Sequence, residues 1–231
     1  MFRLLTQNTK LKKADAYGYF NVGLSLAPHR VSGYQVCPMA SKGCAAACLF
    51  NSGAARAYPK INAARIRKTR MYFENRAEFL ALLNADILTA KRKAARMGKK
   101  LIVRLNVLSD IQWENHGIIQ AHPDVTFYDY TKIAKRMHPD STASKLPNYH
   151  LTFSRSESNQ ADVERVLAWG GNVAAVFEGE LPATYLGRKV VNGDLNDARH
   201  DDEKGVVVGL VEKRTGVRDE SGFIIREGGA A

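Results

Sequence analysis

Hydrophobic and polar residues follow two periods along the chain, and the shorter period predicts six β-strands. From Phe20 to Leu26 every second residue is apolar, as in a strand that buries one face, and Pro28 ends the pattern. Runs of Leu, Ile and Val at 101–107 and 205–211 are typical of strands that are buried on both faces. The six predicted strands cover residues 20–26, 101–107, 125–130, 149–155, 172–177 and 205–211.

Helical periodicity fills most of the intervals between these strands. Pro59 suits the start of a basic helix that continues to Tyr72. Asn75, with Glu78 three residues later, can cap a long helix that reaches Met97. Three shorter helices are predicted over residues 113–118, 131–137 and 159–169.

The alternation of strands and helices predicts an α/β fold with a parallel sheet and right-handed crossovers. Six strands are too few for a closed eight-stranded barrel, so we expect residues 1–231 to form a single domain, an open and partial parallel α/β barrel. Residues 1–16 are expected to form an arm or an early strand. Residues 181–197 are expected to be a linker, and residues 214–231 a frayed tail or one laid over the surface.

The composition is that of a soluble globular protein, with 45% hydrophobic and 25% charged residues. No apolar run is long enough to cross a bilayer, and the N-terminus lacks the apolar core of a signal peptide. We therefore expect no membrane association and a cytoplasmic location, where reducing conditions keep thiols free.

The chain carries a formal net charge of +11, which attracts polyanions. Ten of the cations lie between Lys60 and Lys100, mostly on predicted helices. Either they form a solvated helix face or they bind phosphates, and in the second case we expect weak nucleic-acid binding without sequence preference. No zinc finger, basic region with heptads or aromatic sheet motif predicts sequence-specific recognition.

All three cysteines, Cys37, Cys44 and Cys48, lie within twelve positions between the first predicted strand and the basic helix. Their odd number prevents complete pairing, and clustered cysteines in a reducing compartment are typical of a metal or catalytic site. Cys44 and Cys48 are four residues apart in an alanine-rich stretch, so a helix there would place both sulfurs on one face. Gly43 and Pro38 allow the preceding loop to bring Cys37 to them.

Three thiolates fit an iron–sulfur cluster or a zinc ion, because both accept soft sulfur ligands. A 4Fe-4S cluster needs no fourth protein ligand, since its fourth iron can stay open to a small molecule. Zinc would need a distant histidine, because no histidine lies at zinc-finger spacing from the cysteines. The third interpretation is that the cysteines are buried thiols without a metal.

The position of this cysteine loop, directly after the first strand of a predicted partial barrel, resembles the radical S-adenosylmethionine (SAM) superfamily. In that family the spacing is Cys-x3-Cys-x2-Cys, whereas here it is Cys-x6-Cys-x3-Cys, with Ala47 where an aromatic residue often stands. The resemblance implies that Cys37, Cys44 and Cys48 hold a 4Fe-4S cluster whose open iron binds the amino and carboxylate groups of SAM. Such a protein would be a radical enzyme on an unknown substrate.

The run Cys-Pro-x-Ala-Ser-x-Gly-Cys-x3-Cys, starting at Cys37, is also similar to one in small phage-encoded proteins of unassigned function. This second resemblance implies a location in the host cytoplasm. It leaves two alternatives to an enzyme open. One is a non-enzymatic iron–sulfur protein for electron transfer or nucleic-acid binding, and the other is a zinc protein with three cysteine ligands.

Polar residues at the carboxyl ends of the predicted strands are those that would face the cluster under the radical SAM resemblance. The candidates for binding the cofactor are Asn106, Ser109, Asp110, Ser154, Arg155 and Glu178, followed by Asp129, Tyr130, Glu212 and Lys213. Each has a structural alternative: Ser109 and Asp110 also suit helix caps, and Arg155 suits an exposed loop. A hydrolytic metal site at His200, Asp201 and Asp202 is less favoured than a solvated acidic turn.

Overall fold

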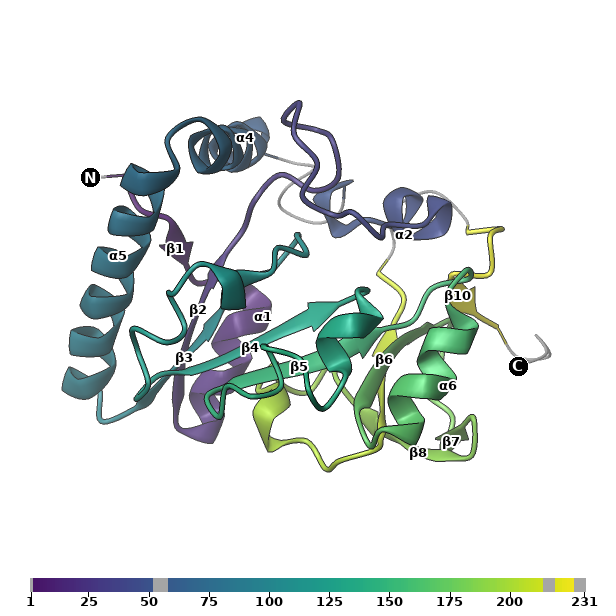
Figure 1. The fold of residues 1–231 in the computed structure, drawn as a ribbon. Helices are drawn as coiled ribbons and strands as arrows, with labels where there is room; N and C mark the ends of the chain where they lie inside the picture. The colour runs from purple at the N-terminus through teal and green to yellow at the C-terminus, as the bar shows by residue number, and fades with distance from the viewer. Residues whose placement is uncertain (1, 52–57, 214–218, 227–231) are drawn as a thin grey trace.

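A ten-stranded sheet runs through the structure (Figure 1), a computed structural model that describes residues 2–51, 58–213 and 219–226. Its order is β1-β2-β3-β4-β5-β6-β9-β8-β7, and β10 adds to β6. The strands are β1 Leu5–Thr6, β2 Tyr19–Leu24, β3 Lys100–Arg104, β4 Thr126–Thr131, β5 Tyr149–Ser154, β6 Asn172–Phe177, β7 Thr184–Tyr185, β8 Arg188–Asn192, β9 Val207–Val211 and β10 Ile224–Ile225.

All six predicted strands are present, as β2, β3, β4, β5, β6 and β9, and each pairs in parallel with its neighbours in this order. The open, mostly parallel sheet of the predicted α/β class is therefore confirmed. Its two edges are β1 and β7, each in an antiparallel pair. The radical SAM-like barrel is not confirmed by this strand order.

Four further strands lie in segments where no strand, or only an early strand, was expected. The predicted linker 181–197 is wrong, because it contains β7 and β8, joined at Leu186 and Gly187 with positive φ. In the predicted tail, β10 pairs in parallel with Val176 and Phe177 of β6. These strands were missed because two-residue strands are too short to show a period of two and β8 begins with two cations. Residues 214–218 and 227–231 of that tail lie outside the described part.

The three long helices agree with prediction: α4 spans Pro59–Glu74, α5 Arg76–Arg96 and α6 Gln160–Ala168. The helices expected over 113–118 and 131–137 are wrong, because only the short 3-10 turns η3 Trp113–Asn115 and η4 Ala134–Met137 form. Thr131 still belongs to β4, and His138 precedes a proline, which disfavours continued helix. Asn75 is the N-cap of α5 as predicted, although its side chain makes no capping hydrogen bond.

Side chains of alternate residues on the strands pack on the two faces of the sheet. Phe20 and Val103 pack in the largest core cluster with α5, whose Phe79, Leu83 and Ile87 are fully buried. At the other end of the sheet, α6 covers β5 and β6. On the opposite face, short elements complete the layer: α1 Thr9–Lys12, η1 Lys13–Tyr17 and η5 Arg199–Asp201. The helices α5 and α6 thus cover one face, and the edge where the parallel strands end is covered by loops together with α2 (Lys42–Ala46) and α4.

Candidate functional site

A cavity of about 800 Å³ opens where the parallel strands of the sheet end. Its wall contains residues at or just beyond the carboxyl ends of β3, β4, β5, β6 and β9. The cysteine loop, α1 and the segment before β10 complete the wall. Ligands commonly bind at this edge of a parallel sheet, because the loops that follow the strands converge there.

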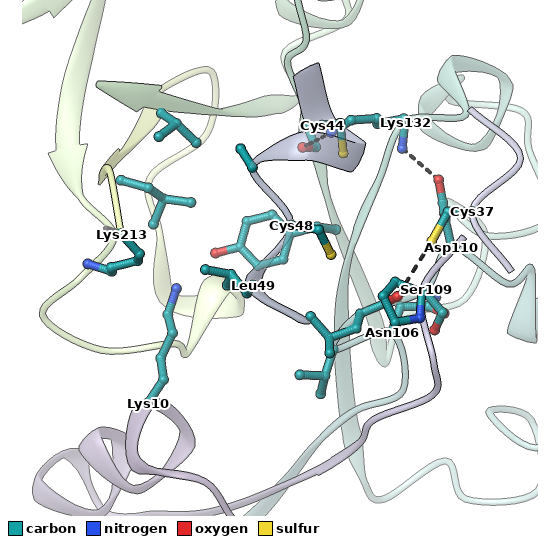
Figure 2. A pocket seen from close by; sticks show the side chains of 18 of the residues that line it. Lys10, Cys37, Cys44, Cys48, Leu49, Asn106, Ser109, Asp110, Lys132 and Lys213 are labelled. Carbon is teal, nitrogen blue, oxygen red and sulfur yellow. Dashed lines mark hydrogen bonds between the residues drawn. The ribbon is translucent and has the colours of Figure 1, made fainter. Parts of the chain in front are cut away.

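All three cysteines line the cavity, as Figure 2 shows. Cys44 lies in α2 (Lys42–Ala46), and Cys48 lies between α2 and the 3-10 turn η2 (Leu49–Asn51). The expectation of one helix that carries both residues is therefore wrong, because α2 ends at Ala46. Each cysteine is a free, half-buried thiol.

The thiol of Cys37 is held by the backbone around it. Its Sγ lies 3.3 Å from the His29 amide, which donates to it, and 3.5 Å from the Leu108 carbonyl. Burial raises the pKa of Cys37 to about 12, and the nearby Cys48 and Cys44 thiols contribute to the rise. Burial also raises the pKa of Cys48. Both residues are therefore neutral thiols at neutral pH, and a metal must displace their protons.

A carboxylate from a distant part of the chain holds α2 in place. Glu157 accepts hydrogen bonds from the Gly43 amide at 2.8 Å and from the Ser41 hydroxyl at 2.7 Å. The Ser41 hydroxyl also accepts from the Cys44 amide at 3.1 Å and so caps α2. A Cβ atom at position 43 would lie 2.0 Å from Ser221 Oγ, so only glycine fits this contact. Cys44 is therefore positioned by contacts that fix its helix.

Two predicted site residues, Arg155 and Glu178, hold the C-terminal segment and are not among the described residues that line the cavity. Arg155 donates to the carbonyls of Gly222 and Phe223 at 2.6 and 2.9 Å. Glu178 forms an ion pair with Arg226 at 3.3 Å. Phe223 does line the cavity, so these two residues act on the site through the wall that they anchor.

Asn106 and Ser109 line the cavity and build the loop after β3. The Asn106 side-chain oxygen accepts from the Ser109 hydroxyl at 2.8 Å, the Ile111 amide at 2.9 Å and the Trp113 indole at 3.1 Å. Its amide nitrogen donates to the Ile111 carbonyl and to Asp129. With its polar atoms engaged in this way, Asn106 fixes the shape of the loop.

Asp110 and Ser154, also in the wall, are joined through Lys132 on the cysteine side of the cavity. Asp110 accepts from the Lys132 amide at 2.8 Å, and the Lys132 ammonium donates to the Ser154 hydroxyl at 2.5 Å. Asp110 also forms an ion pair at 2.9 Å with the buried Arg136. Burial raises the pKa of Asp110, and Arg136 opposes that rise. Four of the six predicted cofactor-binding residues thus line one cavity.

The other side of the cavity is charged, and sequence reasoning missed most of it. Figure 2 shows Lys10 and Lys213 on the side opposite Cys37 and Asp110. Asp197 is fully buried there and pairs with Arg104 at 2.9 Å and with Lys10 at 3.3 Å. Asp197 lies in the segment expected to be a linker, so no sequence signal marked it. Lys213, whose ammonium pairs with Asp194 at 3.0 Å, was among the strand-end candidates, as were Tyr130 and Glu212 in the same wall.

Three buried polar atoms in the cavity wall lack a hydrogen-bond partner among the described residues, and two of them, Arg104 Nε and Asp197 Oδ1, belong to groups that form ion pairs. The third is the hydroxyl of Tyr130, whose ring lies 4.5 Å from the guanidinium of Arg104. A buried hydroxyl without a partner costs free energy unless a water or ligand satisfies it. Its position in the wall of a cavity points to a bound polar group.

Comparison with known proteins places the chain in a family. A model of the family described as Gene product 88 matches residues 3–227. The chain belongs to the Gene product 88 family. This membership agrees with the predicted resemblance to small phage-encoded proteins, and it names no reaction and no cofactor. No curated protein and no solved structure matches the chain, so the radical SAM resemblance gains no support.

Two negative findings apply to the part of the chain that the structure describes. Within residues 2–51, 58–213 and 219–226, no three His, Cys, Asp or Glu side chains form a group that could hold a metal ion. None of the helices in these ranges is long and apolar enough to span a membrane.

We predict that Asp197→Asn destabilises the protein by about 3 kcal/mol at pH 7, because it leaves the guanidinium of Arg104 buried without its charge partner. Burial opposes ionisation, but Arg104 and Lys10 lower the pKa of Asp197 from 3.8 to about 2. The stability that this carboxylate contributes is therefore present above pH 3.8 and is lost as the pH falls through about 2. Urea unfolding at pH 7 and at acidic pH measures the unfolding free energy of wild type and Asp197→Asn. The difference between these two free energies should be smaller at the lower pH.

Asp140→Asn is the matched control, because the Asp140 side chain is 82% exposed. It should change the unfolding free energy by less than about 0.5 kcal/mol. Equal effects of the two substitutions at pH 7 would contradict the role given to Asp197.

Proposed function

We propose that this protein binds a 4Fe-4S cluster through Cys37, Cys44 and Cys48, with one iron open to the cavity. The observation that carries the proposal is that all three cysteines of the chain line one cavity at the carboxyl edge of a parallel sheet. Thiolates are the ligands of such clusters, and three of them leave one iron without a protein ligand.

The thiols do not form a ready ligand set in the described conformation. Binding therefore requires the sulfurs to approach one another and lose their protons. Cys44 is on α2, which the carboxylate of Glu157 holds in place, whereas Cys48 follows the end of that helix and Cys37 is in a loop. We infer that Cys44 is the fixed ligand and that Cys48 moves toward it, as does Cys37 when its Sγ leaves the His29 amide and the Leu108 carbonyl.

The volume of the cavity supports a small molecule beside the cluster. Pockets of 300–1,000 Å³, mostly apolar with a few polar groups, are typical of small-molecule sites, and this cavity of about 800 Å³ falls in that range. Asp110, Lys132 and Ser154 present polar atoms near the cysteines, and the Tyr130 hydroxyl is available for a ligand.

An enzyme of the radical SAM type is the specific form of this proposal. A reduced cluster held by Cys37, Cys44 and Cys48 would supply the electron for reductive cleavage of the SAM sulfonium. The chain's own residues would orient the ligand and exclude water: apolar side chains such as Leu11, Leu108 and Val176 line the cavity. The alternatives are an iron–sulfur protein without enzymatic activity and a zinc protein.

We predict that the protein, reconstituted without oxygen, is brown and holds roughly four irons and four sulfides per chain. Replacing any one of Cys37, Cys44 or Cys48 by Ala should lower the iron content to a small fraction of this, because two thiolates do not hold the cluster. Iron and sulfide analysis with visible absorption measures the result. Met39→Ala, a change in the same cavity wall, is the control and should keep the wild-type iron content.

Zinc at one ion per chain, with no visible absorption, would favour the zinc alternative and overturn the proposal. Iron that persists in all three cysteine variants would also overturn it, since these are the only cysteines in the sequence.

The enzymatic form is tested on the iron-loaded protein. We predict that SAM changes the electron paramagnetic resonance spectrum of the reduced cluster and that SAM with a strong reductant yields 5′-deoxyadenosine. The yield should fall in Cys44→Ala, which loses the cluster. An unchanged spectrum at saturating SAM would contradict the radical SAM form of the proposal, while the proposal of a bound cluster would stand.

A further inference from the structure

The segment that carries the cysteines has an unusual charge pattern. From Ala16 to Phe73 the sequence contains no Asp and no Glu, whereas it contains eight Lys and Arg residues. Elsewhere in the chain acidic and basic residues are mixed, as on α5, where Glu78 and Asp86 lie among the cations. The net positive charge is therefore concentrated on one part of the molecule.

The parts of this segment that follow β2 and that the structure describes lie beside the cavity, and Met39, Cys44 and Leu49 line it. After β2, which is buried in the sheet, the chain runs through the loop 28–41, α2 and then α4. Figure 1 shows these elements along the edge of the sheet where the cysteines lie. We call this surface the cationic rim, and we define it by the exposed residues Arg30, Val31, Met39, Lys42, Leu49, Tyr58 and Lys60.

Three cations of the rim, Arg30, Lys42 and Lys60, are exposed, and none of them forms an ion pair with a residue in the described ranges. By contrast, Lys68 is buried on the Leu4 carbonyl, and Arg70 donates to the Ser32 carbonyl. The free cations are therefore those that an external anion can reach.

The carboxylates that border the rim are mostly engaged within the protein. Glu74 accepts from the Tyr34 hydroxyl at 3.0 Å, and Glu157 holds α2. Asp219 accepts from the Ser221 hydroxyl and the Ile224 amide. Glu220 is exposed and is the one bordering carboxylate in residues 219–226 without such a contact. These hydrogen bonds leave the four carboxylates charged, but the eight Lys and Arg residues of segment 16–73 outnumber them, so the net charge of the segment and its bordering carboxylates is positive.

Large apolar side chains are exposed among these cations. Val31 is 47% exposed, Met39 53%, Leu49 45% and Tyr58 63%. Along the chain they alternate with Arg30, Lys42 and Lys60 and so do not form one apolar run. Tyr58 offers an aromatic ring on which an unstacked base can stack, the other three side chains offer apolar contact, and the cations between them can bind phosphates.

We infer that the cationic rim is a binding surface for single-stranded nucleic acid. Its phosphates pair with Arg30, Lys42 and Lys60, and its bases pack on Tyr58 and the neighbouring apolar side chains. Duplex DNA offers the phosphates but keeps its bases stacked, so it cannot use these apolar contacts. This inference does not depend on a bound cluster.

The test is fluorescence anisotropy with labelled oligothymidine and oligouridine of about 16 nucleotides, and with a duplex of equal length, at about 50 and 200 mM salt. We expect the single strands to bind more tightly than the duplex. Arg30→Ala, Lys42→Ala and Lys60→Ala combined should weaken binding at least about tenfold at low salt and reduce the slope of log affinity against log salt by about 2. Tyr58→Ala should weaken single-strand binding about fivefold or more and leave the salt slope unchanged.

The matched control removes the same charge elsewhere, with Arg92→Ala, Lys145→Ala and Lys204→Ala combined, all exposed residues outside the rim. Circular dichroism and thermal unfolding verify that each variant is folded. An equal loss in the control, equal affinity for duplex and single strand, or no binding at low salt would each overturn the inference. Unequal affinity for oligothymidine and oligouridine, with the rim variants still impaired, supports it and identifies whether DNA or RNA is the better ligand.

Discussion

Parallel pairing of six strands is the constraint on which the rest of this structure depends. Because β2, β3, β4, β5, β6 and β9 all run in the same direction, their carboxyl ends meet at one edge of the sheet. The loops that follow must gather there, and they bring the cysteine loop, Asp110, Lys132 and Ser154 around one cavity. The parallel strand order thus brings residues that are more than a hundred positions apart in the sequence to the same edge of the sheet.

Buried polar contacts hold these loops where apolar packing cannot. Asn106 organises the loop after β3, and Arg136 pairs with both Asp110 and Glu114 at 2.9 Å. On the far side of the cavity Asp197 forms a buried ion pair with Arg104. Buried ion pairs of this kind add little net stability compared with apolar residues, but loss of one partner is costly. The cavity therefore has walls that are specific in shape and sensitive to substitution.

The sequence was sufficient to predict the parallel sheet with its long helices and part of the candidate site. Periodicity located the six parallel strands and the three long helices, and the strand ends then indicated Asn106, Ser109, Asp110 and Ser154. It could not locate β8, because the position of β8 is set by its pairing with β9. It could not locate Asp197 either, because the position of Asp197 is set by its ion pair with Arg104. Arg155 and Glu178 also follow strands, but their side chains bind the residues on either side of β10. That strand is too short to show a period of two in the sequence. Local patterns therefore predict elements, while contacts between distant segments decide which side chains reach the cavity.

The central claim is that the three cysteines act together as ligands of one group. Alkylation of the metal-free and the anaerobically iron-loaded protein, read by mass spectrometry at each cysteine, tests it most directly. The account predicts that Cys37, Cys44 and Cys48 all lose reactivity together on loading and all regain it when a chelator removes the iron. Cysteines that stay as reactive as in the metal-free protein, or that are protected one without the others, would contradict it.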